Sequence, residues 1–146
     1  MPLPASPSTS RVPMPALRTY LVEDSPVIRE NLIAALEELV DIDIVGTADS
    51  ESVATYWLGH QTSGWDLVVI DIFLKSGSGL GVLNSCRERR AGQRLVVLSN
   101  YATTDMRRKC VELGADAVFD KSNEIDALVA YCQRLSEPGT TPDALS

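Results

Sequence analysis

The stretch Leu-Val-Val-Ile-Asp-Ile-Phe-Leu occupies residues 67–74, with Gly64 before it and Gly77 and Gly79 after it. Its length and its Val and Ile content are typical of a β-strand buried on both faces. Such strands belong to parallel sheets whose faces are both covered by helices. An ionised Asp71 inside this run is costly unless it is paired, bound to a metal or placed at the solvated end of the strand. Alone, the pattern also fits a strand-end Asp that accepts hydrogen bonds from loop amides.

Strands and helices alternate along the rest of the chain. Further strands are predicted at residues 18–22, 41–48, 94–99 and 117–120. Helices with apolar residues at helical spacing are predicted at about 26–39, 50–59, 79–90, 104–113 and 124–135. This alternation predicts a doubly wound α/β fold of the flavodoxin-like (βα)5 type. It would have a parallel five-stranded sheet of order 2-1-3-4-5, with right-handed crossovers and helices on both faces.

Composition suggests one domain between two arms. The 146 residues are 45% hydrophobic and 23% charged, which is ordinary for a globular protein. Residues 1–16 hold five of the eight prolines, and residues 137–146 are also rich in Pro, Gly and Thr. We expect both segments to be disordered arms that flank a single domain at 17–136.

Charge, hydropathy and cysteine content argue against several classes of protein. The net charge of -7 argues against non-specific nucleic-acid binding. No apolar run approaches the roughly 20 residues that cross a bilayer, and the N-terminus has no apolar segment of a secretory signal. The three cysteines, Cys86, Cys110 and Cys132, are far apart in the sequence and form no CxxC motif. We therefore expect reduced thiols in a cytoplasmic protein.

Polar side chains follow the carboxyl ends of four predicted strands. Glu23 and Asp24 follow the first strand and Asp71 ends the buried part of the third. Ser99 ends the fourth strand and Lys121 follows the fifth. In a sheet of this order, ligands bind outside the carboxyl ends, where strands one and three are neighbours. We therefore expect these five residues to converge on one crevice.

Three carboxylates in one crevice need positive charge. Two like charges about 4 Å apart repel by ~4 kcal/mol at an effective dielectric constant of about 20. Lys121 supplies one positive charge, and a divalent cation would neutralise the rest. Mg²⁺ suits a site with few protein ligands because it keeps several waters. The same groups fit phosphoryl transfer to a carboxylate, with Asp71 as nucleophile and with Lys121 and Ser99 on phosphoryl oxygens.

These features together resemble the receiver domain of two-component response regulators, over nearly the whole predicted domain. The resemblance is carried by the acidic pair after the first strand, Asp71, Gly79, Ser99 and Phe119 two residues before Lys121. It implies that Asp71 accepts a phosphoryl group from a histidine kinase or a histidine phosphotransfer protein. The chain would then be a phosphoacceptor with slow autodephosphorylation, and not a turnover enzyme.

The resemblance also implies a metal site. Asp24 and Asp71 would bind Mg²⁺ directly, and Glu23 would act through water. The backbone carbonyl of Phe73 would be a further ligand, and Lys121 would contact the phosphoryl group.

A switch is implied as well. Ser99 would move toward the phosphoryl group, and Phe119 would turn inward to fill the space left. The surface formed by the helix at 104–113, the strand at 117–120 and the helix at 124–135 would then bind a protein target, pass the phosphoryl group onward or form a homodimer. Neither nucleic acid nor membrane insertion is implied.

Three positions depart from the usual receiver pattern. Lys75 and Ser122 stand where receivers usually have Pro, and Asn100 stands where a small residue is usual. Without proline, a cis peptide before Ser122 would cost ~3–4 kcal/mol, so a trans peptide is expected. Asn100, with Phe73 and Tyr101 nearby, predicts a crowded site from which attacking water is partly excluded. The phosphoryl group would then be comparatively long-lived.

Three other functions fit this pattern less well. Haloacid-dehalogenase-like phosphatases need a second acid two residues after the nucleophile, where this chain has Phe73. A flavodoxin-like cofactor binder would cradle phosphate in its first loop, where Glu23 and Asp24 would repel it. A receiver-like scaffold that is never phosphorylated stays open because of the departures at Lys75 and Ser122.

Overall fold

The computed structural model describes residues 16–61, 64–100 and 102–136. Except for Ala16, the arms predicted at 1–16 and 137–146 lie outside these residues. The side chain of Tyr101 also lies outside them.

Five parallel strands form one sheet of the order β2-β1-β3-β4-β5, which confirms the predicted fold class and strand order. The strands are β1 (Leu17–Val22), β2 (Ile42–Ala48), β3 (Leu67–Asp71), β4 (Arg94–Ser99) and β5 (Ala117–Asp120). All five residues of β3 are buried, as expected for the central strand of a sheet covered on both faces. Asp71 is its last residue, so the rest of the apolar run belongs to the loop that follows.

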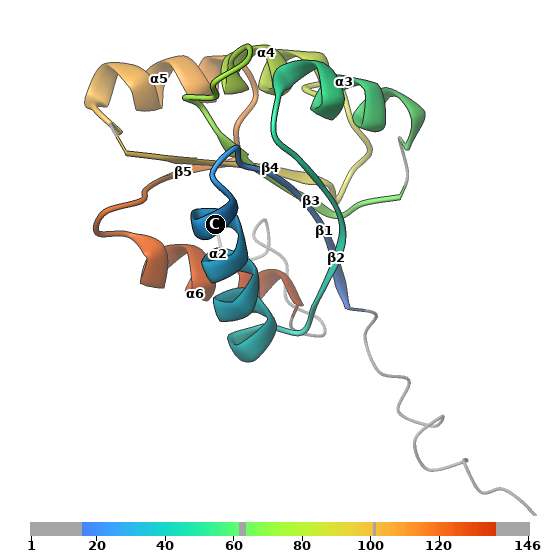
Figure 1. Cartoon of the computed structure of the whole chain (residues 1–146), viewed down its shortest axis with the longest axis vertical. Helices are drawn as coiled ribbons and strands as arrows, with labels where there is room; N and C mark the ends of the chain where they lie inside the picture. The colour runs from blue at the N-terminus through green and yellow to red at the C-terminus, as the bar shows by residue number, and fades with distance from the viewer. Residues whose placement is uncertain (1–15, 62–63, 101, 137–146) are drawn as a thin grey trace, which may run out of the picture.

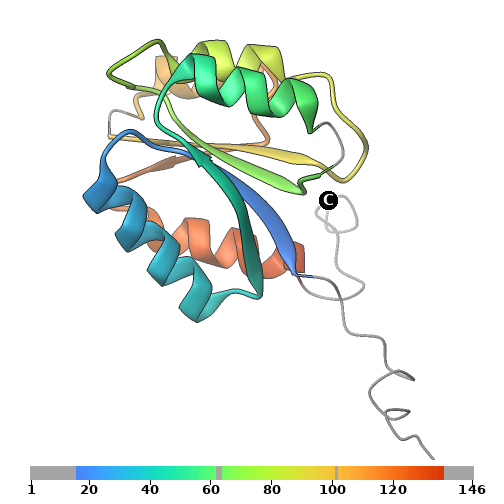
Figure 2. The same ribbon diagram turned by 45° about the vertical axis from the view of Figure 1, so that its right-hand side comes forward.

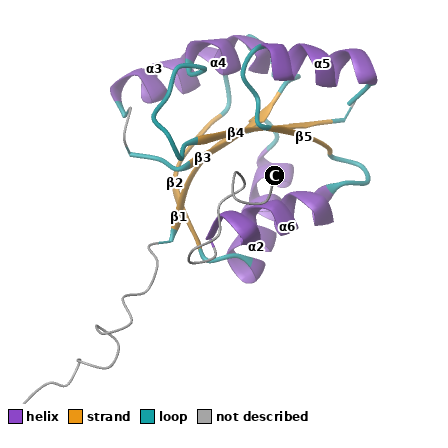
Figure 3. Cartoon of the chain, turned by 180° about the vertical axis from the view of Figure 1, so that it is seen from behind, coloured by secondary structure: helices purple, strands orange, loops and turns teal. Residues whose placement is uncertain are grey.

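Helices cover both faces of the sheet (Figures 1 and 2). One layer consists of α3 (Glu51–His60), α4 (Gly79–Ser85) and α5 (Thr104–Glu112), and the other of α2 (Pro26–Leu39) and α6 (Ile125–Ser136). The view from behind shows the same three layers (Figure 3). Each layer packs its own apolar cluster onto the sheet, because side chains alternate between the two faces along each strand.

Helix α4 is shorter than the sequence predicted. It ends at Ser85 with Cys86 as its C-cap, and not near Arg90. The guanidinium of Arg89 donates at 2.7–3.0 Å to the nearby carbonyls of Arg87 and Gln93. It also donates to two distant acceptors, the Gly114 carbonyl and the Asp116 carboxylate. A helix continuing to residue 90 would carry Arg89 on its surface. Tertiary contacts therefore override the local helical pattern.

The cysteines, Tyr20 and both tryptophans pack in the layers around the sheet. Cys86, Cys110 and Cys132 are free and buried, and burial raises the pKa of Cys86 and of Cys132 to about 12. Trp57 stacks on Tyr20 with ring centroids 4.0 Å apart, while Trp65 is 3% exposed just before β3. Of the helices described, none is long and apolar enough to cross a bilayer.

Gly79 sits where α4 begins, directly against the backbone that follows β3. Its amide donates to the Ile72 carbonyl at 2.9 Å. A Cβ at this position would lie 2.2 Å from the Asp71 carbonyl oxygen and 2.7 Å from the Ile72 Cα. Only glycine allows the helix to approach the end of β3 this closely.

Gly79→Ala should lower the free energy of unfolding by about 3 kcal/mol, because the added Cβ would overlap backbone and not a movable side chain. Gly59→Ala is the matched control, since a Cβ there in α3 meets nothing within 4 Å. Helix propensity predicts a gain of up to about 1 kcal/mol for the control. Urea unfolding measures both, and equal stabilities would contradict the close approach at Gly79.

Candidate functional site

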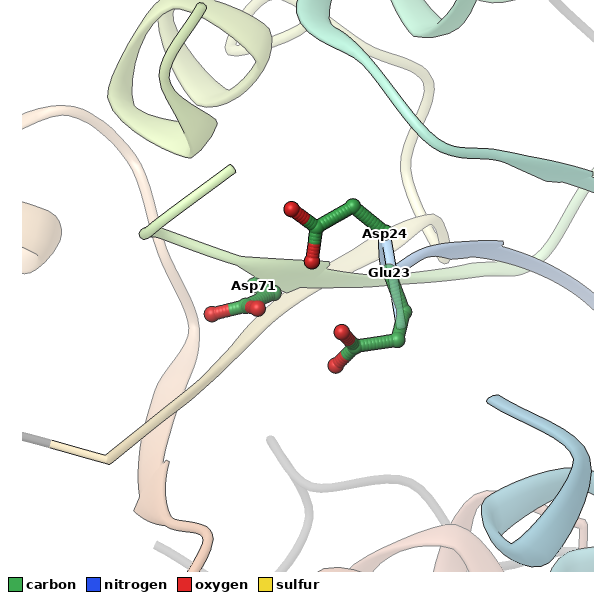
Figure 4. Close-up of side chains that lie close together, drawn as sticks. All are labelled: Glu23, Asp24 and Asp71. Carbon is green, nitrogen blue, oxygen red and sulfur yellow. The ribbon is translucent and has the colours of Figure 1, made fainter. Parts of the chain in front are cut away.

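Three carboxylates meet at the carboxyl ends of β1 and β3 (Figure 4). Glu23 and Asp24 follow β1 directly, and Asp71 ends β3. One carboxylate oxygen from each residue lies within 4.8 Å of the other two. Glu23 is 2% exposed and Asp71 5% exposed, while Asp24 is partly exposed. β1 and β3 are hydrogen-bonded neighbours, and this adjacency brings the three residues together.

Lys121 reaches two of these carboxylates from the loop after β5. Its Nζ lies 2.6 Å from Glu23 Oε1 and 3.0 Å from Asp71 Oδ2. Its backbone amide donates to the Ser99 carbonyl at 2.9 Å, which fixes the loop at the end of β4. One ammonium thus faces three carboxylates, so the site retains an excess of negative charge.

Burial and charge pull the ionisation of these groups in opposite directions. Burial raises the pKa of Asp71, and the hydrogen bond and charge of Lys121 only partly offset it. Burial alone would lower the pKa of Lys121, but bonds and charges from Glu23 and Asp71 together raise it above its ordinary value. Lys121 therefore stays charged at neutral pH. Hard oxygen donors with uncompensated negative charge are the ligand set that a divalent cation such as Mg²⁺ takes.

Backbone amides orient each carboxylate. Ser25 N donates to Glu23 Oε2 at 3.0 Å, and Phe73 N donates to Asp71 Oδ1 at 3.2 Å. These short-range bonds leave the other oxygen of each carboxylate directed at Lys121. The loops after β1 and β3 therefore hold the carboxylates in place.

Lys75 supplies the third of these amides, across a long sequence separation. Its N–H donates to Asp24 Oδ2 at 2.6 Å. Proline, the usual receiver residue at this position, has no N–H and could not make this bond. Because residue 75 is lysine and not proline, its amide can bond Asp24 to the loop after β3.

Glu51 supports the same loop and was not singled out from the sequence. Its Oε1 accepts from Ser78 N at 2.9 Å, and its own amide donates to the Ser76 carbonyl at 3.1 Å. Cβ atoms at Gly77 and Gly81 would lie within 2.4 Å of Glu51 side-chain atoms. An acidic residue in the first turn of a helix is normally explained by the helix dipole, so the sequence carried no sign of this role.

Ser99 and Phe119 do not share a face of the sheet. Ser99 is fully buried at the end of β4, and strand alternation places it on the face of Val97, beneath α3, α4 and α5. Phe119 packs on the other face, edge-to-face with Tyr131 of α6 at a centroid distance of 5.8 Å. Val118 is the β5 residue on the face of Ser99. Ser99 and Phe119 thus face opposite sides of the sheet, and the inward turn of Phe119 stays a prediction.

The Lys121 loop is built without proline. No cis peptide bond occurs among the described residues, as expected for the peptide before Ser122. The Asp120 carboxylate accepts from the Ser122 amide at 2.8 Å and from the Ser122 hydroxyl. A side-chain turn therefore shapes this loop.

Comparison with known proteins agrees with this geometry. The sequence model of the family described as response regulator receiver domain matches residues 19–133. The chain belongs to the response regulator receiver family. The resemblance seen in the sequence is thereby confirmed. Receiver domains of two-component systems generally accept a phosphoryl group from histidine kinases or phosphotransfer proteins and are not turnover enzymes.

Relatives of the receiver family match most of this chain. The alkaline phosphatase synthesis transcriptional regulatory protein SphR of Synechococcus elongatus is 31% identical over 143 residues, covering 90% of this chain and 55% of SphR. The chain spans about half the length of the curated relatives it matches.

Solved structures share the receiver fold. A DNA-binding response regulator of the LuxR family from Staphylococcus aureus has a TM-score of 0.72 at 19% identity, covering 83% of this chain and 99% of that one. A Burkholderia pseudomallei response regulator, with a phosphorylated aspartic acid, calcium ion and citrate, has a TM-score of 0.67 at 21% identity, covering 82% and 68%. At these identities, the likeness shows the fold alone.

Asp71→Asn should raise the free energy of unfolding at pH 7 by about 1 kcal/mol in the absence of divalent cations. Burial raises the pKa of Asp71, so its anion is less stable in the fold than in the unfolded chain. As pH falls below the raised pKa of Asp71, the stability gain of the variant becomes smaller. It vanishes below the ordinary pKa of 3.8, where Asp71 is protonated in both the folded and the unfolded wild type.

Urea unfolding in EDTA across this pH range measures the gain. Asp43→Asn on β2 is the matched control, because Asp43 is exposed and loses the same charge. If Asp71→Asn were no more stable than Asp43→Asn at pH 7, the buried charge would not be destabilising.

Proposed function

We propose that this receiver domain is a phosphorylation-dependent switch in which Asp71 accepts a phosphoryl group with Mg²⁺ bound beside it. One observation carries the proposal. The Asp71 carboxylate lies in a cluster of three carboxylates within 4.8 Å, with the Lys121 ammonium 3.0 Å from its Oδ2. This is the charge arrangement that phosphoryl transfer to a carboxylate requires.

The transfer itself needs only a nucleophile and charge stabilisation. An oxygen of the Asp71 carboxylate attacks phosphorus, and the bond from phosphorus to the donor histidine nitrogen breaks, its electron pair leaving with that nitrogen. An acyl phosphate forms on Asp71. The attacking carboxylate is already an anion, so it gives up no proton. Lys121 exchanges its bond to Asp71 for one to a phosphoryl oxygen, and the Ser99 hydroxyl donates to another.

The metal ligands are proposed on the same cluster. Asp24 and Asp71 would hold Mg²⁺ directly, with the Phe73 carbonyl as backbone ligand. Glu23 would act through water, which suits its engagement with Lys121 at 2.6 Å. When bound, Mg²⁺ supplies positive charge that offsets the charge of the transferred group.

The partners follow from the family. A histidine kinase or histidine phosphotransfer protein supplies the phosphoryl group, and the surface of α5, β5 and α6 then engages a protein target, an onward acceptor or a second copy. Phosphorylation replaces the single negative charge of Asp71 with a group that carries about 1.5 to 2 negative charges at pH 7. This change in charge biases the conformation of the surrounding loops. The phosphorylated aspartic acid of the Burkholderia pseudomallei neighbour supports this assignment by fold analogy.

The alternatives are less well supported. A scaffold that is never phosphorylated was suggested by the departures at Lys75 and Ser122. Both loops nevertheless hold their site residues, through the 2.6 Å bond to Asp24 and the turn beside Lys121. A phosphatase would need an acid at Phe73, whose side chain carries no proton to transfer.

Acetyl phosphate with Mg²⁺ should add one phosphoryl group to the wild type, read promptly by intact mass. The gain should be lost when Mg²⁺ is omitted, and in Asp71→Asn, which lacks the nucleophile. Asp43→Asn should be labelled like the wild type. Absence of labelling in a folded wild type that also fails to bind Mg²⁺ by calorimetry would favour the scaffold.

Asn100→Ala should hasten loss of the phosphoryl group by a factor of about 3 to 10, which corresponds to at most ~1.4 kcal/mol of the barrier. Asn100 is exposed after β4 and lines one pocket with Lys121, so removing its side chain opens a path for water. Asn84→Ala on α4, also exposed, is the control. Mass spectrometry after donor removal gives both lifetimes, and a slower loss in Asn100→Ala would refute the crowding.

A further inference from the structure

Arg107 connects three segments that are separate in the chain. It lies in the first turn of α5, and each of its guanidinium nitrogens has an acceptor. Nε donates to the Ala102 carbonyl at 3.0 Å, Nη1 to the Val118 carbonyl at 2.9 Å and Nη2 to Glu124 Oε1 at 2.8 Å. These acceptors lie in the loop after β4, in β5 and just before α6. We call Arg107 with these three partners the Arg107 clamp.

The clamp continues into the loop that carries Lys121. Glu124 Oε1 also accepts from the backbone amide of Asp120 at 2.7 Å, and the Glu124 amide donates to the Asp120 carbonyl at 2.8 Å. Asp120 immediately precedes Lys121, and its carboxylate closes the turn through Ser122. Lys121 is thus held between residues that the clamp fixes, while its ammonium contacts Asp71.

We propose that Arg107 is a positioning residue that sets the place of Lys121 and couples the Lys121 loop to α5. When Lys121 shifts toward a phosphoryl group, the displacement of residues 120–124 passes through Glu124 and Arg107 to α5. The coupling rests on the proposed phosphorylation of Asp71.

The shape of the guanidinium supports this role. Its donors are fixed in one plane, so a movement of any partner breaks a bond or moves the whole group with it. A lysine has its three donors on one nitrogen, so it could not span acceptors that lie opposite three separate guanidinium nitrogens. The clamp also joins the loops after β4 and β5, whereas Ser99 and Phe119 lie on opposite faces of the sheet.

The neighbouring arginine provides a matched control. Arg108 bonds only to Asp105 on its own helix among the contacts described, at 3.3 Å, with 64% and 90% of the two side chains exposed. Such exposed pairs contribute little to stability. Arg107→Gln and Arg108→Gln make the same chemical change on the same helix, but only the first removes a connection to the Lys121 loop.

The resting protein tests positioning. In Arg107→Gln, hydrogen exchange of residues 119–124 should be faster than in wild type, and phosphorylation by acetyl phosphate should slow about tenfold through misplacement of Lys121. Mg²⁺ affinity by calorimetry should be unchanged, because the three carboxylates are untouched. General destabilisation would change both the phosphorylation rate and the Mg²⁺ affinity, so a change in the rate alone indicates positioning. Arg107→Lys should not restore the rate. Unchanged exchange and rate, or equal effects in Arg108→Gln, would overturn the proposal.

The activated protein tests coupling. Mg²⁺ with beryllium fluoride should change hydrogen exchange in both residues 119–124 and α5 of the wild type and Arg108→Gln. Arg107→Gln should keep the first change and lose most of the second. An α5 change as large as in wild type, or none in wild type, would overturn the coupling.

A second variant separates the possible failures. Glu124→Ala removes the same link from its other end and should reproduce the loss of the α5 response, so it replaces Arg107→Gln if that variant does not fold. If the wild type is not phosphorylated on Asp71, the proposed function fails. The exchange of residues 119–124 in the resting variants still decides whether Arg107 positions the Lys121 loop.

Discussion

The Lys121 ammonium bonds simultaneously to Glu23 after β1 and to Asp71 at the end of β3, and the surrounding architecture is what makes this contact possible. β4 lies between β3 and β5, so the lysine must pass the end of β4 to reach the carboxylates. The residue at that end is Ser99, small and fully buried, whose carbonyl binds the Lys121 amide. The charged centre thus depends on strand order as much as on the identities of its members.

Contacts from α3, α4 and the loop after β1 hold the segment that follows β3. Gly79 lets α4 begin against the Asp71 carbonyl, Glu51 grips the loop between them, and Lys75 binds Asp24 through its amide. Each contact joins residues on different elements, and all three act on the segment that follows β3. The loop that carries Lys121 has no proline next to that lysine, and Glu124 links it to Arg107 by hydrogen bonds.

Much of this could be predicted from the sequence, because strand ends follow from local apolar runs and the alternation of elements fixes a parallel sheet. The positions of Glu23, Asp24, Asp71 and Lys121 in one crevice follow from that order alone. The end of α4 could not be predicted, since the acceptors of Arg89 lie up to 27 residues away. The face of Phe119 depends on the phase of a four-residue strand, where a slip of one residue reverses every side chain.

The stack of Trp57 on Tyr20 has a consequence for optical spectroscopy. Trp57 belongs to the layer of α3, and Trp65 lies before β3, about 20 Å from Asp71 at the rise of an extended strand. Indole emission in this protein therefore reports on the packing of α3 and on the amino ends of the strands. The change in fluorescence on unfolding therefore measures stability with two indoles that are not members of the acidic crevice. A ligand at the crevice would be detected by the shift that it causes in the unfolding transition.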